Sequence, residues 1–141
     1  MGDRAALERS SAAGPAGPTG PAGPAGPPYL TVTSDTAASA GNVARRVSGG
    51  NAEKATGGTA GAGLGALGLY GVNVAGGGSA QIYRTGSRCP LAGLPVGELW
   101  RSNTGTAVLY GSLVVGEYSN RLGYSDGSGV DVHIGPEEQV L

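Results

Sequence analysis

The sequence predicts a small all-β domain, either a Gly-rich β-barrel or a β-sandwich, preceded by a collagen-like stalk and a short N-terminal arm. Three observations carry this prediction. Glycine makes up 29 of the 141 residues, about three times its usual share. Short apolar runs recur between Gly-containing turns, and no amphipathic helical period follows residue 28. Five Gly-Pro-Y triplets stand before these runs.

The first segment, residues 1–13, combines charged side chains with the short apolar run Ala5-Ala6-Leu7. It is too short to form a stable isolated helix in water. We expect either an arm that docks on a partner or a frayed terminus.

Residues 14–28 read GPA-GPT-GPA-GPA-GPP, with proline after every glycine. Three polyproline II chains can wind around one another only if every third residue is glycine, because no side chain fits at the axis. The axis residues would be Gly14, Gly17, Gly20, Gly23 and Gly26. So short a triple helix needs a trimeric domain to keep its chains in register, so the period predicts a homotrimer. The alternative is a Pro/Gly-rich linker without partners.

Residues 29–141 are expected to form the β domain. Its strands are predicted at 29–33, 42–47, 53–56, 63–74, 79–84, 91–94, 99–100, 106–109, 121–124 and 130–134. Gly49-Gly50-Asn51 is typical of a hairpin turn, and Gly76-Gly77-Gly78 marks another turn. The glycines within 63–74 suggest a bulge or a close backbone approach.

Composition excludes several classes of protein. A net charge of −1 with only nine Lys and Arg residues provides no electrostatic footprint for nucleic acid. No apolar run approaches the ~20 residues of a membrane span, and the polar N-terminus is unlike a secretory signal peptide. The single Cys89 cannot form an intramolecular disulfide or a multi-cysteine zinc site.

We expect no enzyme activity, no cofactor and no metal site. The one histidine, His133, lies on the same strand face as Asp131, but no nucleophile-elbow motif accompanies the pair. The Gly-rich residues 58–63 lack the lysine and the following helix of a phosphate loop. Nothing in the sequence sets a carboxylate pair at glycosidase spacing among Glu98, Glu117, Asp126 and Asp131.

Aromatic and arginine side chains are the candidates for contacts with partners. The aromatic ones are expected in the core or an interface, with a glycan-stacking platform as the alternative; they are Tyr83, Trp100, Tyr110, Tyr118 and Tyr124. The arginines would face either acidic groups of neighbouring subunits or solvent; they are Arg45, Arg46, Arg84, Arg88, Arg101 and Arg121.

Four segments between residues 41 and 135 carry a resemblance to a known family. They are GNVARRVSGGNAEKAT (41–56), GLGALGLYGVNVAGGGSAQIYRTG (63–86), LAGLPVGELWRSNTGTAV (91–108) and GEYSNRLGYSDGSGVDVHIG (116–135). Their turns and hydrophobic positions resemble a β-rich domain of tailed-bacteriophage virion proteins, both fibre-like and head-associated. Collagen-like triplets joined to a small trimeric domain likewise resemble phage fibres and head fibres.

The resemblance implies a non-enzymatic structural protein of the virion, on the outer surface of the capsid or on the tail. A homotrimeric capsid decoration or head-fibre protein is the expected role. Its partners would be copies of itself and the major capsid protein or another virion protein. The alternative is a tail-fibre or receptor-binding module that binds a glycan of the host surface. A non-viral collagen-like surface protein is a further alternative.

Overall fold

The computed structural model describes residues 29–62 and 65–141, so the expected arm (1–13) and collagen-like segment (14–28) lie outside the described residues. The strands run in chain order as β1 (Leu30–Thr33), β2 (Val43–Arg46), β3 (Ala52–Lys54), β4 (Ala66–Tyr70), β5 (Ser79–Arg84), β6 (Arg88–Cys89), β7 (Gly97–Arg101), β8 (Ala107–Leu109), β9 (Tyr118–Ser125), β10 (Val130–Val132) and β11 (Glu137–Gln139).

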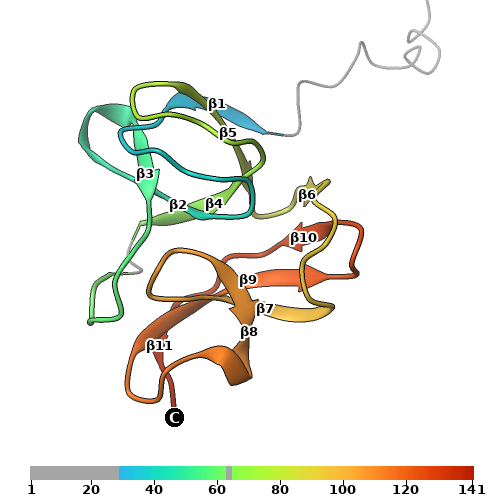
Figure 1. The fold of residues 1–141 in the computed structure, drawn as a ribbon. Coiled ribbons are helices and arrows are strands. Elements are labelled where there is room, and N and C mark those ends of the chain that lie inside the picture. The colour runs from blue at the N-terminus through green and yellow to red at the C-terminus, as the bar shows by residue number, and fades with distance from the viewer. Residues whose placement is uncertain (1–28, 63–64) are drawn as a thin grey trace, which may run out of the picture.

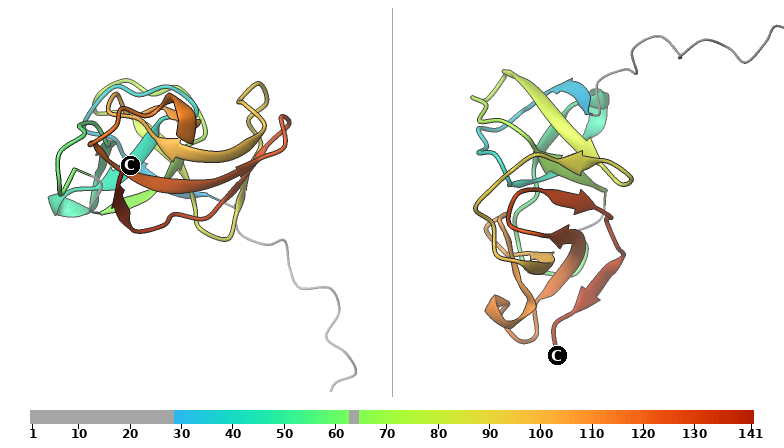
Figure 2. Two further views of the ribbon diagram at one scale, coloured as in Figure 1. Left: turned by 90° about the horizontal axis from the view of Figure 1, so that it is seen from below. Right: turned by 90° about the vertical axis from the view of Figure 1, so that its right-hand side faces the viewer.

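The strands form two curled antiparallel sheets, which confirms the all-β prediction (Figure 1). The first sheet has the order β1-β5-β4-β2-β3, and the second has the order β6-β10-β9-β7-β8, with β11 paired to β9. The first sheet is complete before the second begins, and the two lie one above the other (Figure 2). The helical turns in the described residues are η1 (Ser48–Gly50) and η2 (Tyr110–Ser112); neither has the length or hydropathy of a membrane span.

The first sheet curls until its two edges meet. A parallel bridge there joins Ser34, just after β1, to Ala52 in β3. Its interior is filled mainly by alanines around two large side chains, Tyr70 and Ile82. The Tyr70 hydroxyl is 2.8 Å from Ser34 Oγ, and Ser34 Oγ donates to the Thr36 carbonyl. Alanines suit this interior because a tightly curled sheet leaves little volume inside it.

The opposite face of the first sheet packs against the second sheet. Leu69 and Tyr83 lie on this face, whereas their neighbours Tyr70 and Ile82 point into the curl. Both faces of the sheet are therefore buried, which explains why β4 is apolar throughout instead of alternating. The core shared by the two sheets consists of Val43, Ala55, Leu69, Tyr83, Cys89, Leu99, Ala107, Leu122, Val130 and Val132.

A bulge beside a glycine occurs in each sheet, as the glycines of 63–74 suggested for the first. The pairing of β4 shifts between Gly68 and Ala66, and that of β9 shifts between Gly123 and Arg121. A Cβ on Gly68 would lie 2.0 Å from the Tyr83 carbonyl oxygen. Without a side chain the neighbouring backbone can approach closely, and bulges increase local twist, so these sites help the sheets to curl.

Most predicted strands match the structure to within a few residues, and η1 forms the predicted turn between β2 and β3. The prediction at 91–94 was wrong: this segment is a loop in which Leu91 and Leu94 pack against the core. The preceding Pro90 has no N–H to donate to a ladder. The strand predicted at 63–74 is shorter, and neither β6 nor β11 was predicted.

Candidate functional site

The outer face of the second sheet carries several of the candidate site residues. Strand pairing aligns Arg88 with Asp131, Asp131 with Tyr124 and Tyr124 with Glu98. Side chains directly opposite in an antiparallel pair lie on the same face, so these four residues form one row. Trp100 and Arg121 form a second aligned pair. We call these six residues the outer face.

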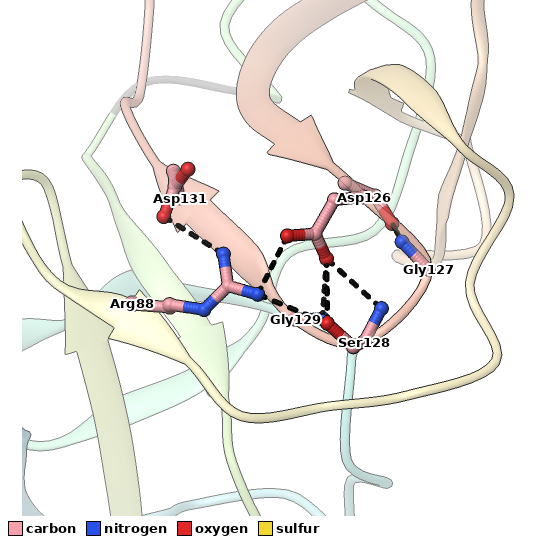
Figure 3. A network of polar contacts seen from close by, with 7 residues as sticks. Arg88, Asp126, Gly127, Ser128, Gly129 and Asp131 are labelled. Carbon is pink, nitrogen blue, oxygen red and sulfur yellow. Dashed lines mark hydrogen bonds and ion pairs between the residues drawn. The ribbon is translucent and has the colours of Figure 1, made fainter.

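One end of the outer face is an ion-paired cluster around Arg88 (Figure 3). Arg88 Nη2 lies 2.7 Å from Asp126 Oδ2 and Nη1 lies 3.1 Å from Asp131 Oδ1. The other Asp126 oxygen, Oδ1, accepts hydrogen bonds from the amides of Ser128 and Gly129 and from Ser128 Oγ. The backbone bond from Ser128 and the Arg88 contact hold the pKa of Asp126 well below its usual range. This carboxylate therefore accepts hydrogen bonds and is unsuited to proton transfer near neutral pH.

The other end is organised by Glu98 and the indole of Trp100. Trp100 Nε1 donates to Glu98 Oε1 over 3.2 Å, and Arg121 Nε lies 2.9 Å from Glu98 Oε2. The Arg121 guanidinium also lies 5.7 Å from the centre of the Trp100 ring, and Tyr110 packs edge-on against that ring at 5.0 Å. These contacts cover the indole and hold it in place.

Tyr124 stands between the two charged groups, and 53% of it is exposed. Glu98 is opposite it on β7 and Asp131 is opposite it on β10. An exposed phenol with carboxylates and guanidiniums fixed on both sides can stack on a flat apolar surface while its neighbours hydrogen-bond to polar groups around it. The arrangement suits binding.

The five aromatic candidates lie in different parts of the structure. Trp100, Tyr110 and Tyr124 belong to or adjoin the outer face. Tyr83 lies in the shared core against Tyr29, with ring centres 5.5 Å apart, and Tyr118 is half-buried at the start of β9. The five stalk glycines, Gly14, Gly17, Gly20, Gly23 and Gly26, lie outside the described residues.

The four carboxylates considered for catalysis have structural contacts within the chain. Asp131 pairs with Arg88, and Glu117 Oε2 accepts a hydrogen bond from Asn103 Nδ2. Cys89 is buried in the core, where burial raises the pKa of its thiol to about 11. Within residues 29–62 and 65–141 there is no group of three or more His, Cys, Asp and Glu side chains that could hold a metal ion.

Arg101 has a role that the sequence did not indicate. It was expected to face a neighbouring subunit or solvent, yet it is only 1% exposed within its own chain. Its guanidinium donates to the carbonyls of Gly57 and Tyr118 and to Asn120 Oδ1, at 2.6–3.0 Å. Burial lowers its pKa. Arg101 thus ties the loop after β3 to β9, and no motif in the sequence marks these acceptors.

The other arginines with ion pairs also find partners in their own chain. Arg45 pairs with Glu53, its neighbour across β2 and β3, as Arg88 and Arg121 pair with acidic residues of the second sheet. An open pocket of about 640 Å³ lies between the sheets beside Arg84 and Glu137. Glu137 also accepts a hydrogen bond from the amide of Gly61, so this carboxylate joins the loop after β3 to β11.

The fold and the outer face define a small all-β protein with two curled sheets and a surface of ion-paired and aromatic side chains. No family model, curated protein or solved structure matches the chain.

Proposed function

We propose that this chain is a non-enzymatic structural protein of a tailed-phage virion, a homotrimeric capsid decoration or head-fibre protein. The observation that carries the proposal is the run of five uninterrupted Gly-Pro-Y triplets next to a small all-β domain. The turn and hydrophobic pattern between residues 41 and 135, which resembles that of phage virion domains, supports the viral assignment.

The triplets favour a trimer for a physical reason. A glycine at every third position is needed only where three chains share an axis. The last triplet ends at residue 28 and β1 begins at Leu30, so a triple helix would lead directly into the first sheet. Three β domains would then be held close together around the same axis.

The β domain suits a mechanical role. Its two sheets share one core, and the buried Arg101 ties a loop of the first sheet to the second. The carboxylates of the outer face are held by arginines of the same chain. The protein would sit on the outer surface of the capsid, or on the tail, bound to the major capsid protein or another virion protein.

The test has two parts. Sedimentation of the full chain should give three times the chain mass of 13.7 kDa, and a stable monomer would contradict the proposal. Imaging of the intact particle from which the chain came should show its density at threefold or quasi-threefold positions on the capsid. Density only at the tail would favour the second candidate function.

The second candidate is a tail-fibre or receptor-binding module that recognises a host-surface glycan. The exposed Tyr124, between Glu98 and Asp131, favours it, because sugar rings stack on aromatic side chains while paired polar groups bind hydroxyls. A glycan array probed with the full chain should then give binding that Tyr124→Ala abolishes. Binding unaffected by Tyr124→Ala would exclude the outer face as the glycan site.

A further inference from the structure

Large apolar side chains gather at one end of the second sheet. Seven are exposed in the described residues, and five of them lie on the segment that includes η2 and on the last residue. We call these five the end patch: Leu109, Tyr110, Val114, Val115 and Leu141. Concentrations of exposed apolar side chains mark surfaces that bind other proteins.

Hydrogen bonds join the two segments that carry the end patch. The Leu141 amide donates to the Tyr110 hydroxyl over 3.2 Å, and the Gly116 amide donates to the Val140 carbonyl over 2.8 Å. The residues from β11 to the end of the described chain therefore lie along the loop between β8 and β9. Residues 109–116 read LYGSLVVG and contain no charged side chain.

Val114 and Val115 are exposed at a turn in the part of the chain that the structure describes. The Glu117 amide donates to the Val114 carbonyl, which closes a turn over residues 114–117, and Gly116 has the positive φ of +92° that its place in the turn requires. Turn corners favour Gly, Pro, Asn, Asp and Ser. Val114 is 56% exposed and Val115 is 74% exposed, so the turn presents β-branched apolar side chains to solvent.

We propose that the end patch is the surface by which the β domains of three copies of this chain associate. The inference rests on the proposed homotrimer. A triple helix of five triplets is too short to hold three chains in register alone, so the β domains must contribute contacts. The segment 109–116 has no charged side chain, so its copies can meet around a threefold axis without placing like-charged side chains together.

The position of the end patch fits this role. β1, which follows the triplets in the chain, lies at the top of Figure 1, whereas β8, β11 and the C-terminal end lie at the bottom. Contacts through the end patch would join the three copies at the end opposite the triple helix. The trimer would then be held together at both ends.

The experiment compares the full chain with three variants by sedimentation over a range of concentrations. Val114→Asp/Val115→Asp should shift the protein from trimer to monomer and raise the concentration for half-assembly at least tenfold. Val96→Asp is the matched control, because Val96 is 62% exposed but lies outside the end patch, beside Gly127; it should remain trimeric. Val115→Ser, which adds no charge, should weaken assembly in the same direction.

The outcomes separate the two proposals. A trimeric wild type with an equally stable trimer in both valine variants would overturn the end-patch interface and leave the proposed homotrimer standing, with the patch free for another virion protein. A monomeric wild type would overturn the homotrimer and the interface together. Circular dichroism checks that each variant is folded; if the double variant is not, Val115→Ser decides.

Discussion

Arg101 shows how a single buried charge can stabilise this fold. It is enclosed by its own chain, and three acceptors on two segments of the chain surround its guanidinium. A buried charge is tolerated only where hydrogen bonds replace water. Its hydrogen bonds add to the backbone bond from the Tyr118 amide to the Gly58 carbonyl, which also holds the loop of residues 55–62 against the second sheet.

Arg101→Met should therefore lower the free energy of unfolding by roughly 3 kcal/mol, because it leaves the Gly57 and Tyr118 carbonyls without their donor. Arg46→Met is the matched control, since Arg46 is exposed, and it should change the stability by less than about 0.5 kcal/mol. Urea unfolding of both variants measures the difference. Equal stabilities would show that Arg101 contributes nothing measurable.

Cys89 should make the stability of the protein fall at alkaline pH. Burial raises the pKa of its thiol from 9.0 to about 11, so the unfolded chain loses this proton at lower pH than the folded chain does. The corresponding stability is fully present below pH 9 and is lost as the pH rises to about 11. Burial raises the pKa values of Tyr70 and Tyr83 as well, and both act in the same direction.

Denaturant unfolding at a series of pH values checks this expectation. The wild type should lose stability from about pH 9 upward, and Cys89→Ala should show a smaller loss between pH 9 and 11, with the tyrosine effect remaining. The native thiol should also react with a disulfide reagent far more slowly than the unfolded one, because Cys89 is 0% exposed. Identical pH profiles, or a fast native reaction, would contradict the buried-thiol explanation.

At the scale of the element, Gly123 controls the pairing of β9 with β10. A Cβ at this position would lie 2.1 Å from the Asp131 carbonyl oxygen, and its φ of +143° is one that side-chain-bearing residues rarely adopt. Gly123→Ala should force β10 away from β9 and lower the free energy of unfolding by about 3 kcal/mol.

The control for this substitution is Gly111→Ala in η2, where no atom lies within 4 Å of the added Cβ. It should change the stability by less than about 1 kcal/mol. Thermal unfolding followed by circular dichroism gives both values. If the two substitutions cost the same, then the close approach of β10 to Gly123 does not matter for stability.

The collagen-like segment allows a test of the same kind. Gly20→Val puts a side chain at the expected axis and should make residues 14–28 sensitive to protease while the β domain stays folded. Thr19→Val is the matched control, because a Y-position side chain points away from the axis. Limited proteolysis followed by mass spectrometry measures both, and equal resistance in the two variants would argue against a triple helix.

At the scale of the whole molecule, the described residues consist of two curled sheets that follow one another in the sequence and share a core. The sequence predicted the all-β class and most of the strands, because short apolar runs and Gly-rich turns are local signals. It did not indicate β11, whose residues Glu137–Gln139 have low strand propensity. They pair because β9 is long enough to pair with β10 at one end and with β11 at the other.

The outer face could be predicted only in part. Trp100, Tyr110 and Tyr124 were expected from their type in the core, in an interface or in a glycan-stacking platform, and the structure places them on or beside one face. Tyr83, selected in the same way, lies in the core. Residue type does not reveal which side of a strand faces the second sheet, since that depends on register and on the bulges in β4 and β9.

The sequence by itself determined the period of the collagen-like segment, the all-β class and the positions of most turns, because each depends on residues close together in the chain. Only the tertiary structure decided that Arg101 is buried, that Arg88 and Arg121 pair within the chain, and that Leu141 lies beside Tyr110. These facts depend on contacts between distant segments, and no local pattern determines which segments meet when two sheets curl and pack.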